Sequence, residues 1–209
     1  MKTNPSLTVL VFVLSLTSAV AQSTSAFPPG LISWWRAEGN SADATGAHAG
    51  LAEGDLTYAN GQRGQCFVLN GGNAAVWLGT WFTLQQFTLS LWVNPADGQM
   101  GYADLMDNNH DSSVSWPIQF QNFNEGGISR WQWGPNGGTG GLINFDLQIN
   151  AWQHLVIARD GTNGTALYLN GALAGTSSGA YSPIPYNGSQ VLHLGRHQSF
   201  GRYFLGMVD

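Results

Sequence analysis

The sequence predicts an all-β protein in which two antiparallel sheets pack face to face. Short apolar segments recur with Gly, Pro, Asn and Asp between them, and helical periodicity of useful length is missing after the N-terminal leader. In Phe87–Val93 apolar side chains alternate with Thr, Ser and Trp, the pattern of a strand with one face in the core. The segment HLVIA, His154–Ala158, is apolar on both faces, as expected of a central strand. Two packed sheets satisfy both patterns.

Individual strands follow from the same alternation and from the turn residues that bound each segment. The two Gly-rich segments Gly134–Gly141 and Gly175–Ser189 are predicted to be loops. The dipeptides Asp160-Gly161 and Asn170-Gly171 favour tight turns on either side of one strand, because these residues tolerate positive φ. The predicted strands in chain order are Leu31–Trp35, Gln65–Asn70, Ala74–Gly79, Phe87–Asn94, Ser115–Gln121, Ile128–Trp133, His154–Arg159, Thr165–Asn170, Val191–Gly195 and Tyr203–Val208.

The N-terminus is predicted to be a secretory signal peptide over residues 1–21. Lys2 precedes the apolar run Leu7–Leu16, and Ala19-Val20-Ala21 has the small-residue pattern of a cleavage site. The run is too short to span a bilayer, so no membrane insertion is expected. The mature chain is therefore expected to be secreted, to the extracellular space or the periplasm, with a short lead at 22–29 before a single domain.

Composition narrows the class of partner. Charged residues make up 9% of the chain, the formal net charge is −5, and Lys2 is the single lysine. So few cations cannot neutralise many phosphates, which argues against nucleic acid and anionic membranes and favours uncharged partners. Cys66 is the single cysteine, so no disulfide forms within the chain, and its place in an apolar strand predicts a buried side chain.

Several segments together resemble the laminin G-like, concanavalin A-like jelly-roll modules that are common in secreted bacterial proteins. The order and spacing of these segments make the resemblance specific, although each alone is a strand flanked by turn residues. The segments are GLISWWRAEGNSADATGAHAG, GQCFVLNGGNAAVWLG, FTLSLWVNP, WQHLVIARDGTNGTALYLNGALAG and FLGMVD. The resemblance implies a jelly-roll β-sandwich of two curved antiparallel sheets over residues 30–209, with ligands met by the concave face or its loops.

Two departures from the family pattern change what is expected. The family's final motif continues past the aspartate into a further strand, whereas this sequence stops at Asp209, so the domain is expected to lack its last strand and to leave a sheet edge open. Asn70 and Asn73 stand where the family usually has carboxylates, which argues against a cation at that turn.

Catalytic patterns are missing from the sequence. The β-glucanases of the same general fold carry an E-x-D-x-E strand, and no strand here has one. The nearest approach is the segment with Asp104, Asp107 and Asp111, whose density of polar residues predicts a loop. There is no G-x-S-x-G motif, and the pair His193 and His197 lies on a predicted strand end rather than on the helix that a zinc motif needs. An enzyme is not expected.

Calcium is the one cofactor that the resemblance suggests. It points to the turn NSADATG and to the family's terminal aspartate, so Asp43 and Asp209 are the candidate ligands of a structural ion. The alternative is that Asp43 only organises a local turn and that Asp209 has no ligand role.

Aromatic residues supply the candidate ligand-binding site. Trp131 and Trp133 lie two residues apart, so they share one face of a strand, with Arg130 on the other face. Flat rings beside polar groups are typical of sugar sites, whereas an inward-facing core pair is the alternative. Further candidate ligand-binding residues are His110, Tyr168 and His193.

The leading hypothesis is a non-catalytic secreted module that binds carbohydrate, or a glycosylated or protein partner. One alternative is a structural or adhesive module of a larger cell-surface protein, and another is a divergent glycoside hydrolase or lyase. Two carboxylates facing each other in a cleft would favour the enzyme, and exposure of Trp131 and Trp133 in a groove would favour their proposed sugar site.

Overall fold

The structure is a computed structural model, and it describes residues 27–108, 118–125, 128–134, 142–161, 164–177, 184, 186 and 188–209. The predicted signal peptide and the residues His110 and Asp111 lie outside the described residues. The chain divides into two compact units, residues 1–30 and 31–209. The described part of the first unit, Phe27–Gly30, contains a turn, and all that follows concerns the second unit.

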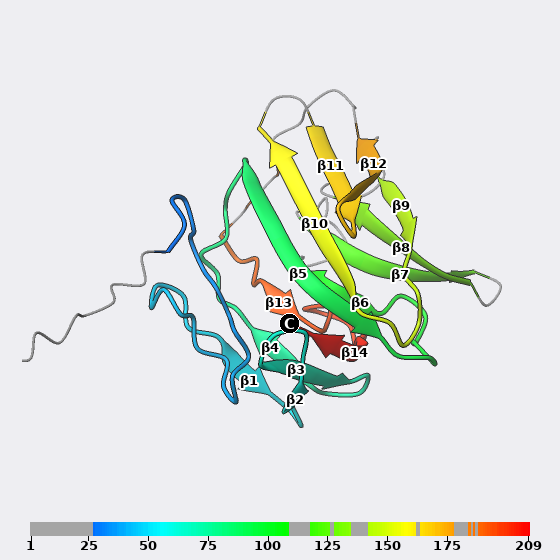
Figure 1. Ribbon diagram of the computed structural model, residues 1–209, viewed down its shortest axis with the longest axis horizontal. Coiled ribbons are helices and arrows are strands. Elements are labelled where there is room, and N and C mark those ends of the chain that lie inside the picture. Colours follow the sequence, from blue (N-terminus) through cyan, green and yellow to red (C-terminus); the bar gives the residue numbers. More distant parts are fainter. Residues whose placement is uncertain are drawn as a thin grey trace, which may run out of the picture. The chain divides into compact units, whose positions relative to one another are not determined.

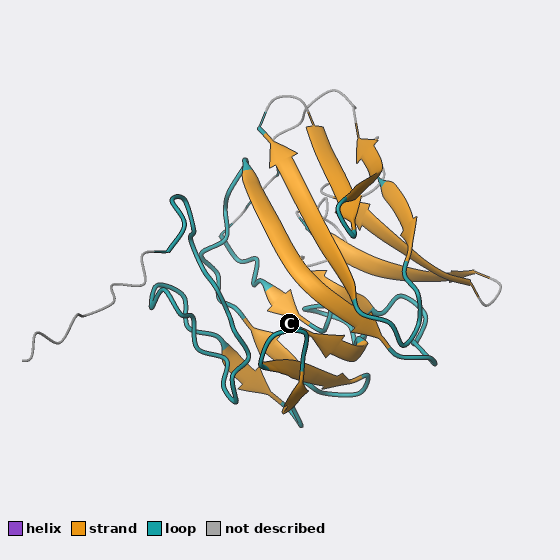
Figure 2. Ribbon diagram, in the orientation of Figure 1, coloured by secondary structure: helices purple, strands orange, loops and turns teal. Residues whose placement is uncertain are grey.

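In the described residues of the second unit, the strands form two antiparallel sheets of seven strands each, with no helix among them (Figures 1 and 2). We call the first the β6 sheet. Its spatial order is β1 (Leu51–Glu53), β4 (Ala75–Trp77), β13 (His193–Leu194), β6 (Asp104–Asp107), β7 (Gln119–Glu125), β8 (Ile128–Gly134) and β9 (Ile143–Asp146). A search of the described residues for a helix long and apolar enough to cross a membrane finds none.

We call the second the β5 sheet. Its spatial order is β12 (Ala172–Ser177), β11 (Gly164–Leu169), β10 (Gln153–Asp160), β5 (Phe87–Pro95), β14 (Leu205–Val208), β3 (Gln65–Asn70) and β2 (Thr57–Asn60). Strands β12, β11, β10 and β5 lie side by side in this order at one end of the sheet (Figure 1). The predicted jelly-roll sandwich is confirmed.

The core lies between the two sheets, because alternate side chains of every strand point to the partner sheet. The β6 sheet contributes Val76, Met106, Phe120, Trp131, Trp133, Ile143, Phe145 and Leu194 to it. The β5 sheet contributes Phe67, Leu69, Phe87, Leu91, Val93, Leu155, Ile157, Leu167 and Val208. The rings of Phe87 and Trp133 meet edge to face at 6.4 Å and so join the sheets directly.

The turn between β11 and β12 has the predicted chemistry. Asn170 and Gly171 form a two-residue connection, with φ values of 51° and 80°. Two successive positive φ values are what a type I′ hairpin turn needs, and Asn-Gly is the pair that adopts them most readily. This turn therefore explains Asn170 without a functional role.

Strand β14 lies inside the β5 sheet, between β3 and β5. It pairs with β5 over Val93–Pro95, and the next residue, Asp209, exchanges backbone hydrogen bonds of 2.8 and 3.0 Å with Trp92. Among the described strands, none pairs with the N-terminal half of β5 on the side away from β10. Backbone direction alternates along an antiparallel strand, so the amide groups of Thr88 and Ser90 point to that open side.

The predicted strand Leu31–Trp35 is wrong, because its backbone bonds are made locally. Trp34 donates its N–H to the Asp43 carboxylate at 2.9 Å, and its carbonyl accepts the N–H of Ala44 at 2.8 Å. Trp35 forms one isolated bridge with Asp43. A folded-back turn thus replaces the ladder that a neighbouring strand would have provided.

The predicted loop around Asp104 is also wrong over Asp104–Asp107, which form the central strand β6. Leu105 and Met106 are buried and hold the strand in place from the core side. The pairing with β7 shifts between Asp104 and Met106, a bulge that brings both aspartates to the same face of the sheet. The density of polar residues therefore marked a buried polar face rather than a loop.

Candidate functional site

The outer face of the β6 sheet is polar across its width. The register places His193 beside both Trp77 and Asp107, and Asp107 beside Gln119. The side chains on this face are Glu53, Trp77, Arg130, Gln132, Asn144 and Asp146 toward solvent, and Asp104, Asp107, Gln119, Gln121 and His193 in the buried centre. A sheet face with so many hydrogen-bonding groups is unusual for packing alone.

One flank of this face combines a tryptophan with fixed polar groups. We call Leu51, Glu53, Trp77, His193 and Arg196 the Trp77 surface. Trp77 is partly exposed, and its cross-strand neighbour Leu51 is 58% exposed. Arg196 Nε lies 3.0 Å from Glu53 Oε2, and Arg196 Nη2 lies 3.1 Å from His193 Nε2. The guanidinium thus contacts Glu53 and His193, and His193 is the cross-strand neighbour of Trp77.

The buried centre of the face contains a carboxyl pair. Asp104 and Asp107 are both fully buried, and Asp104 Oδ2 accepts a bond of 3.4 Å from Gln121 Nε2. Burial raises the pKa of Asp104 well above its usual value, and the charge of Asp107 raises it further. Folding therefore disfavours the charged form of the Asp104 carboxyl.

Two histidines beside the carboxyl pair are held neutral. Burial lowers the pKa of His193 to about 4, and the charge of Arg196 acts in the same direction. Burial also lowers the pKa of His197 to about 4, with smaller effects from Arg202 and Arg196. Since His193 Nε2 faces the Arg196 guanidinium, this nitrogen is the acceptor of the neutral ring.

The chain that follows β13 lies against this face and fixes its rim. The backbone carbonyl of Arg202 accepts hydrogen bonds from the N–H of Asp104 at 3.3 Å and from the N–H of His197 at 3.2 Å. Gln198 donates its N–H to Asp107 Oδ2 at 3.0 Å. Tyr203 forms bridges with Asp104 and with Arg196. Hydrogen bonds therefore join this segment to β6, and the segment lies against the carboxyl pair.

The prediction that Trp131 and Trp133 stack on a sugar is wrong. Both side chains are 0% exposed and point into the core. Trp133 packs on Phe120 at 4.5 Å between ring centroids, and Trp131 on Phe204 at 5.6 Å. The alternation on β8 was inferred correctly, but the apolar face is the inner one, so the core-pair alternative holds.

The other predicted ligand residues are not brought together. Arg130 and His193 share the outer face of the β6 sheet, but three strand spacings, about 14 Å, separate their strands. Arg130 is exposed, with its Nε 4.0 Å from Asp146. Tyr168 lies on the outer face of the β5 sheet, beside Val156, on the opposite side of the sandwich. His110 lies outside the described residues.

The surroundings of Asp43 do not fit a calcium ion. Its two oxygens accept bonds of 2.8–2.9 Å from the N–H groups of Trp34, Thr45 and His48 and from the Thr45 hydroxyl. Burial alone would raise the pKa of Asp43, but these hydrogen bonds more than offset it and lower the pKa. A carboxylate with four donors needs no cation, so here it organises the turn.

Asp209 has a different environment. Its Oδ2 accepts the backbone N–H of Arg63 at 2.7 Å. Among the described residues, no three His, Cys, Asp or Glu side chains are placed to share a metal ion. The calcium prediction at Asp209 stays a prediction.

Sequence reasoning missed the Trp77 surface because its members are far apart in the chain. Glu53, Trp77 and Arg196 come from three segments that meet only through the order β1, β4, β13. The available signal was local: Trp77 points opposite to the buried Val76 in a strand that otherwise reads as core. A tryptophan on the outward side of a strand is the pattern to search for.

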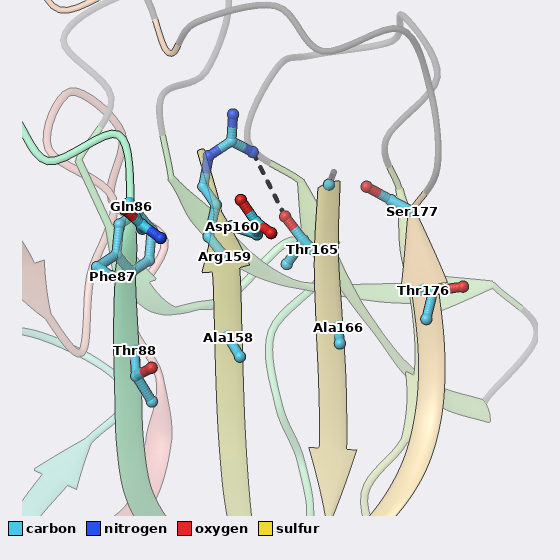
Figure 3. A pocket seen from close by; sticks show the side chains of 11 residues that line it. Gln86, Phe87, Thr88, Ala158, Arg159, Asp160, Thr165, Ala166, Thr176 and Ser177 are labelled. Atoms are coloured by element: carbon cyan, nitrogen blue, oxygen red, sulfur yellow. Dashed lines mark hydrogen bonds between the residues drawn. The ribbon is translucent and has the colours of Figure 1, made fainter. Parts of the chain in front are cut away.

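A concave region lies elsewhere, at the ends of β5, β10, β11 and β12 (Figure 3). It is a pocket of about 650 Å³ lined by Gln86, Phe87, Thr88, Ala158, Arg159, Asp160, Gly164, Thr165, Ala166, Thr176 and Ser177. The buried Arg159 donates from Nε to the Gln85 carbonyl at 3.1 Å and from Nη1 to Thr165 Oγ1 at 3.4 Å. Within this described lining the one aromatic ring, Phe87, is packed in the core, so the Trp77 surface is better suited to stacking.

Family comparison agrees with this architecture. A family model described as the concanavalin A-like lectin/glucanases superfamily matches residues 69–209. The chain belongs to this superfamily. The resemblance inferred from the sequence is thereby confirmed, and the two antiparallel sheets are the sandwich expected of concanavalin A-like proteins. No curated protein sequence matches this concanavalin A-like chain significantly.

Solved structures share the fold at low sequence identity. Domain 4 of AbnA, a GH43 extracellular arabinanase from Geobacillus stearothermophilus in complex with arabinotriose, has a TM-score of 0.63 and 20% identity, covering 81% of this chain and 84% of that one. The binding domain of botulinum neurotoxin DC in complex with rat synaptotagmin II has a TM-score of 0.59 and 15% identity, covering 79% and 43%. Botulinum neurotoxin type C, described as dependent on two ganglioside molecules for cell entry, has a TM-score of 0.56 and 15% identity. The match covers 80% of this chain and 44% of that one.

Proposed function

We propose that this chain is an exported, non-catalytic domain that binds carbohydrate, free or carried on a glycoprotein, at the Trp77 surface. The observation that carries the proposal is the position of Trp77, a partly exposed indole whose neighbouring strands carry His193 and Glu53, the two partners of Arg196, on the same face. Aromatic faces stack on the apolar face of a sugar ring, and oriented polar groups beside them bond its hydroxyl groups.

Similar structures support the choice of ligand class. The arabinanase domain is in complex with arabinotriose, and the type C neurotoxin is described as depending on gangliosides. Both ligands contain sugars, although the low identities mean that only the fold is shared. Arabinotriose and ganglioside oligosaccharides are therefore the first probes for this chain.

Binding is favoured over hydrolysis because of burial. Asp104 and Asp107 share one face of the sheet, which is the arrangement that a pair of catalytic carboxylates needs, but each is 0% exposed. A sugar ring has no access to them in this arrangement. Release of reducing ends from the bound oligosaccharide, lost in Asp104→Asn, would instead establish a glycoside hydrolase.

The test of the proposal is glycan-array screening followed by calorimetry with the variants Trp77→Ala and Trp92→Ala. Trp92 is the matched control, because it is a partly exposed tryptophan on the outer face of the other sheet. Trp77→Ala should weaken binding about tenfold, equivalent to about 1.4 kcal/mol, and Trp92→Ala should leave it unchanged. Absence of binding by the wild-type chain to every glycan would favour a structural or adhesive module.

Export and calcium binding belong to the proposal as separate steps. The N-terminal sequence supports export, and sequencing the protein recovered outside the cytoplasm should find Gln22 as its first residue. Calorimetry with and without calcium tests the ion at Asp209. An unchanged affinity and melting temperature after chelation would remove calcium from the proposal.

A further inference from the structure

An arginine stacked between two exposed rings forms a second feature at the rim of the β6 sheet. The guanidinium carbon of Arg202 lies 4.6 Å from the centre of the Phe200 ring and 5.2 Å from the centre of the Tyr102 ring. Tyr102 is 48% exposed and Phe200 is 41% exposed. We call these three residues the Arg202 stack. Both rings are therefore about half exposed, and Phe200 also packs on the buried His197 ring at 4.8 Å between ring centroids.

Tyr102 occupies a turn position that favours glycine. Ala103 donates its N–H to the Met100 carbonyl at 3.2 Å, which closes a turn with Gly101 and Tyr102 at its centre. Tyr102 has a φ of 63°, a conformation that glycine adopts freely and that a bulky residue adopts at a cost of about 1–3 kcal/mol. Strain of this kind is typical of residues that contact ligands, since the fold alone would favour glycine there.

The charge of Arg202 is placed for a ligand. Among the described residues, no carboxylate lies within 4.0 Å of the Arg202 guanidinium, whose charge acts on the buried Asp104 and His197 from a longer distance. The backbone around Arg202 is fixed, because its N–H is bonded to Phe200 at 2.7 Å and its carbonyl to β6. A preorganised guanidinium with stacked faces keeps its N–H edge for a planar anion such as a carboxylate.

We infer that the Arg202 stack binds the carboxylate of an acidic sugar, such as a uronic acid residue, while a ring of the stack contacts the sugar face. This inference rests on the proposed carbohydrate binding and adds a second subsite to it. The net charge of −5 disfavours nucleic acids, whereas a single guanidinium suits one carboxylate of a uronic acid residue. Sulfate and carboxylate share this chemistry, and the experiment separates them.

Calorimetry with oligogalacturonate, its carboxyl-reduced neutral counterpart and a sulfated oligosaccharide tests the inference. The wild-type chain should bind oligogalacturonate at least about tenfold more tightly than the reduced counterpart. Arg202→Gln should abolish that preference. Arg130→Gln is the matched control, because Arg130 is an exposed arginine on the outer face of the same sheet, 4.0 Å from Asp146, and it should keep the preference.

Tyr102→Gly separates binding from folding. Glycine adopts the positive φ without strain, so the melting temperature should stay the same or rise, while affinity for oligogalacturonate falls about fivefold or more.

A preference that persists in Arg202→Gln, or an equal affinity for the sulfated oligosaccharide, overturns the assignment to a carboxylate. If Trp77→Ala alone abolishes all binding, the proposed function stands without this subsite. If acidic sugars bind through Arg202 and Trp77→Ala has no effect, the subsite stands and the Trp77 surface is overturned.

Discussion

At the scale of single residues, Asp104 is the clearest conflict between burial and charge. Its carboxyl is fully buried beside Asp107, and its raised pKa means that folding favours the protonated form. In the unfolded chain the carboxyl ionises at its ordinary pKa of 3.8. The stabilising contribution of the protonated form is complete below that value and is lost as the pH rises through the folded pKa.

Asp104→Asn should therefore stabilise the protein at neutral pH. The asparagine amide keeps an oxygen that accepts from Gln121, and it cannot ionise. The free energy of unfolding should therefore rise by about 1.4 kcal/mol for each unit by which folding raises the pKa of Asp104. Chemical denaturation at pH 7 and at pH 4 measures the effect, which should be larger at pH 7. Asp107→Asn is the control and should destabilise, since Asp107 accepts the Gln198 N–H as a charge. Destabilisation by Asp104→Asn at pH 7 would mean that the carboxylate form is native.

Trp133 is the residue that tests the corrected role of the tryptophan pair. Trp133→Ala should lower the free energy of unfolding by about 3–5 kcal/mol, because a fully buried ring that contacts both sheets is removed. Trp133→Phe should cost less and leave glycan affinity unchanged. Urea denaturation and calorimetry on the same samples decide this. A folded Trp133→Phe protein that loses sugar binding would restore Trp133 to the site.

At the scale of elements, the strands with strict alternation were predictable and the site was not. Phe87–Pro95 was located to within one residue from its two-residue periodicity, and Gln153–Asp160 from its short apolar run, because both signals are local. β6 was missed because a bulge and a non-local ladder override the loop propensity of its polar residues. The Trp77 surface depends on strand order, which the distant partners β1, β4 and β13 determine together.

The open side of β5 predicts self-association. Thr88 and Ser90 point their backbone amides to the side where no described strand pairs, and such edges recruit other strands. Thr88→Pro removes an amide that points to the open side, so it should keep stability and reduce self-association in sedimentation experiments. Leu89→Pro is the control, because its amide faces Ile157 in β10, and it should destabilise by about 3 kcal/mol. Equal self-association by wild type and Thr88→Pro would exclude this edge.

At the scale of the whole molecule, the neutral histidines determine how stability responds to acid. His193 and His197 have folded pKa values of about 4 against an ordinary 6.5, so the unfolded chain binds more protons below pH 6.5. Their contribution is complete above pH 6.5 and is lost as the pH falls toward 4. Asp104 acts in the opposite direction over part of this range, because folding raises its pKa.

The two effects can be separated in one experiment. In the Asp104→Asn background, the free energy of unfolding should fall between pH 6.5 and 4.5 by about 1.4 kcal/mol per unit for each histidine. The wild-type chain should show a shallower fall, because Asp104 offsets part of it. Parallel pH profiles for the two proteins would show that Asp104 does not titrate with folding.

The place of β14 has a consequence for how the protein is made. The sheet needs Leu205–Val208 between β3 and β5, and these residues come after every other described strand in the chain. A ribosome must release almost the whole described domain before the two halves of the β5 sheet can be joined. Until then no strand joins β3 to β5, so the order of the strands prevents the β5 sheet from forming early in synthesis.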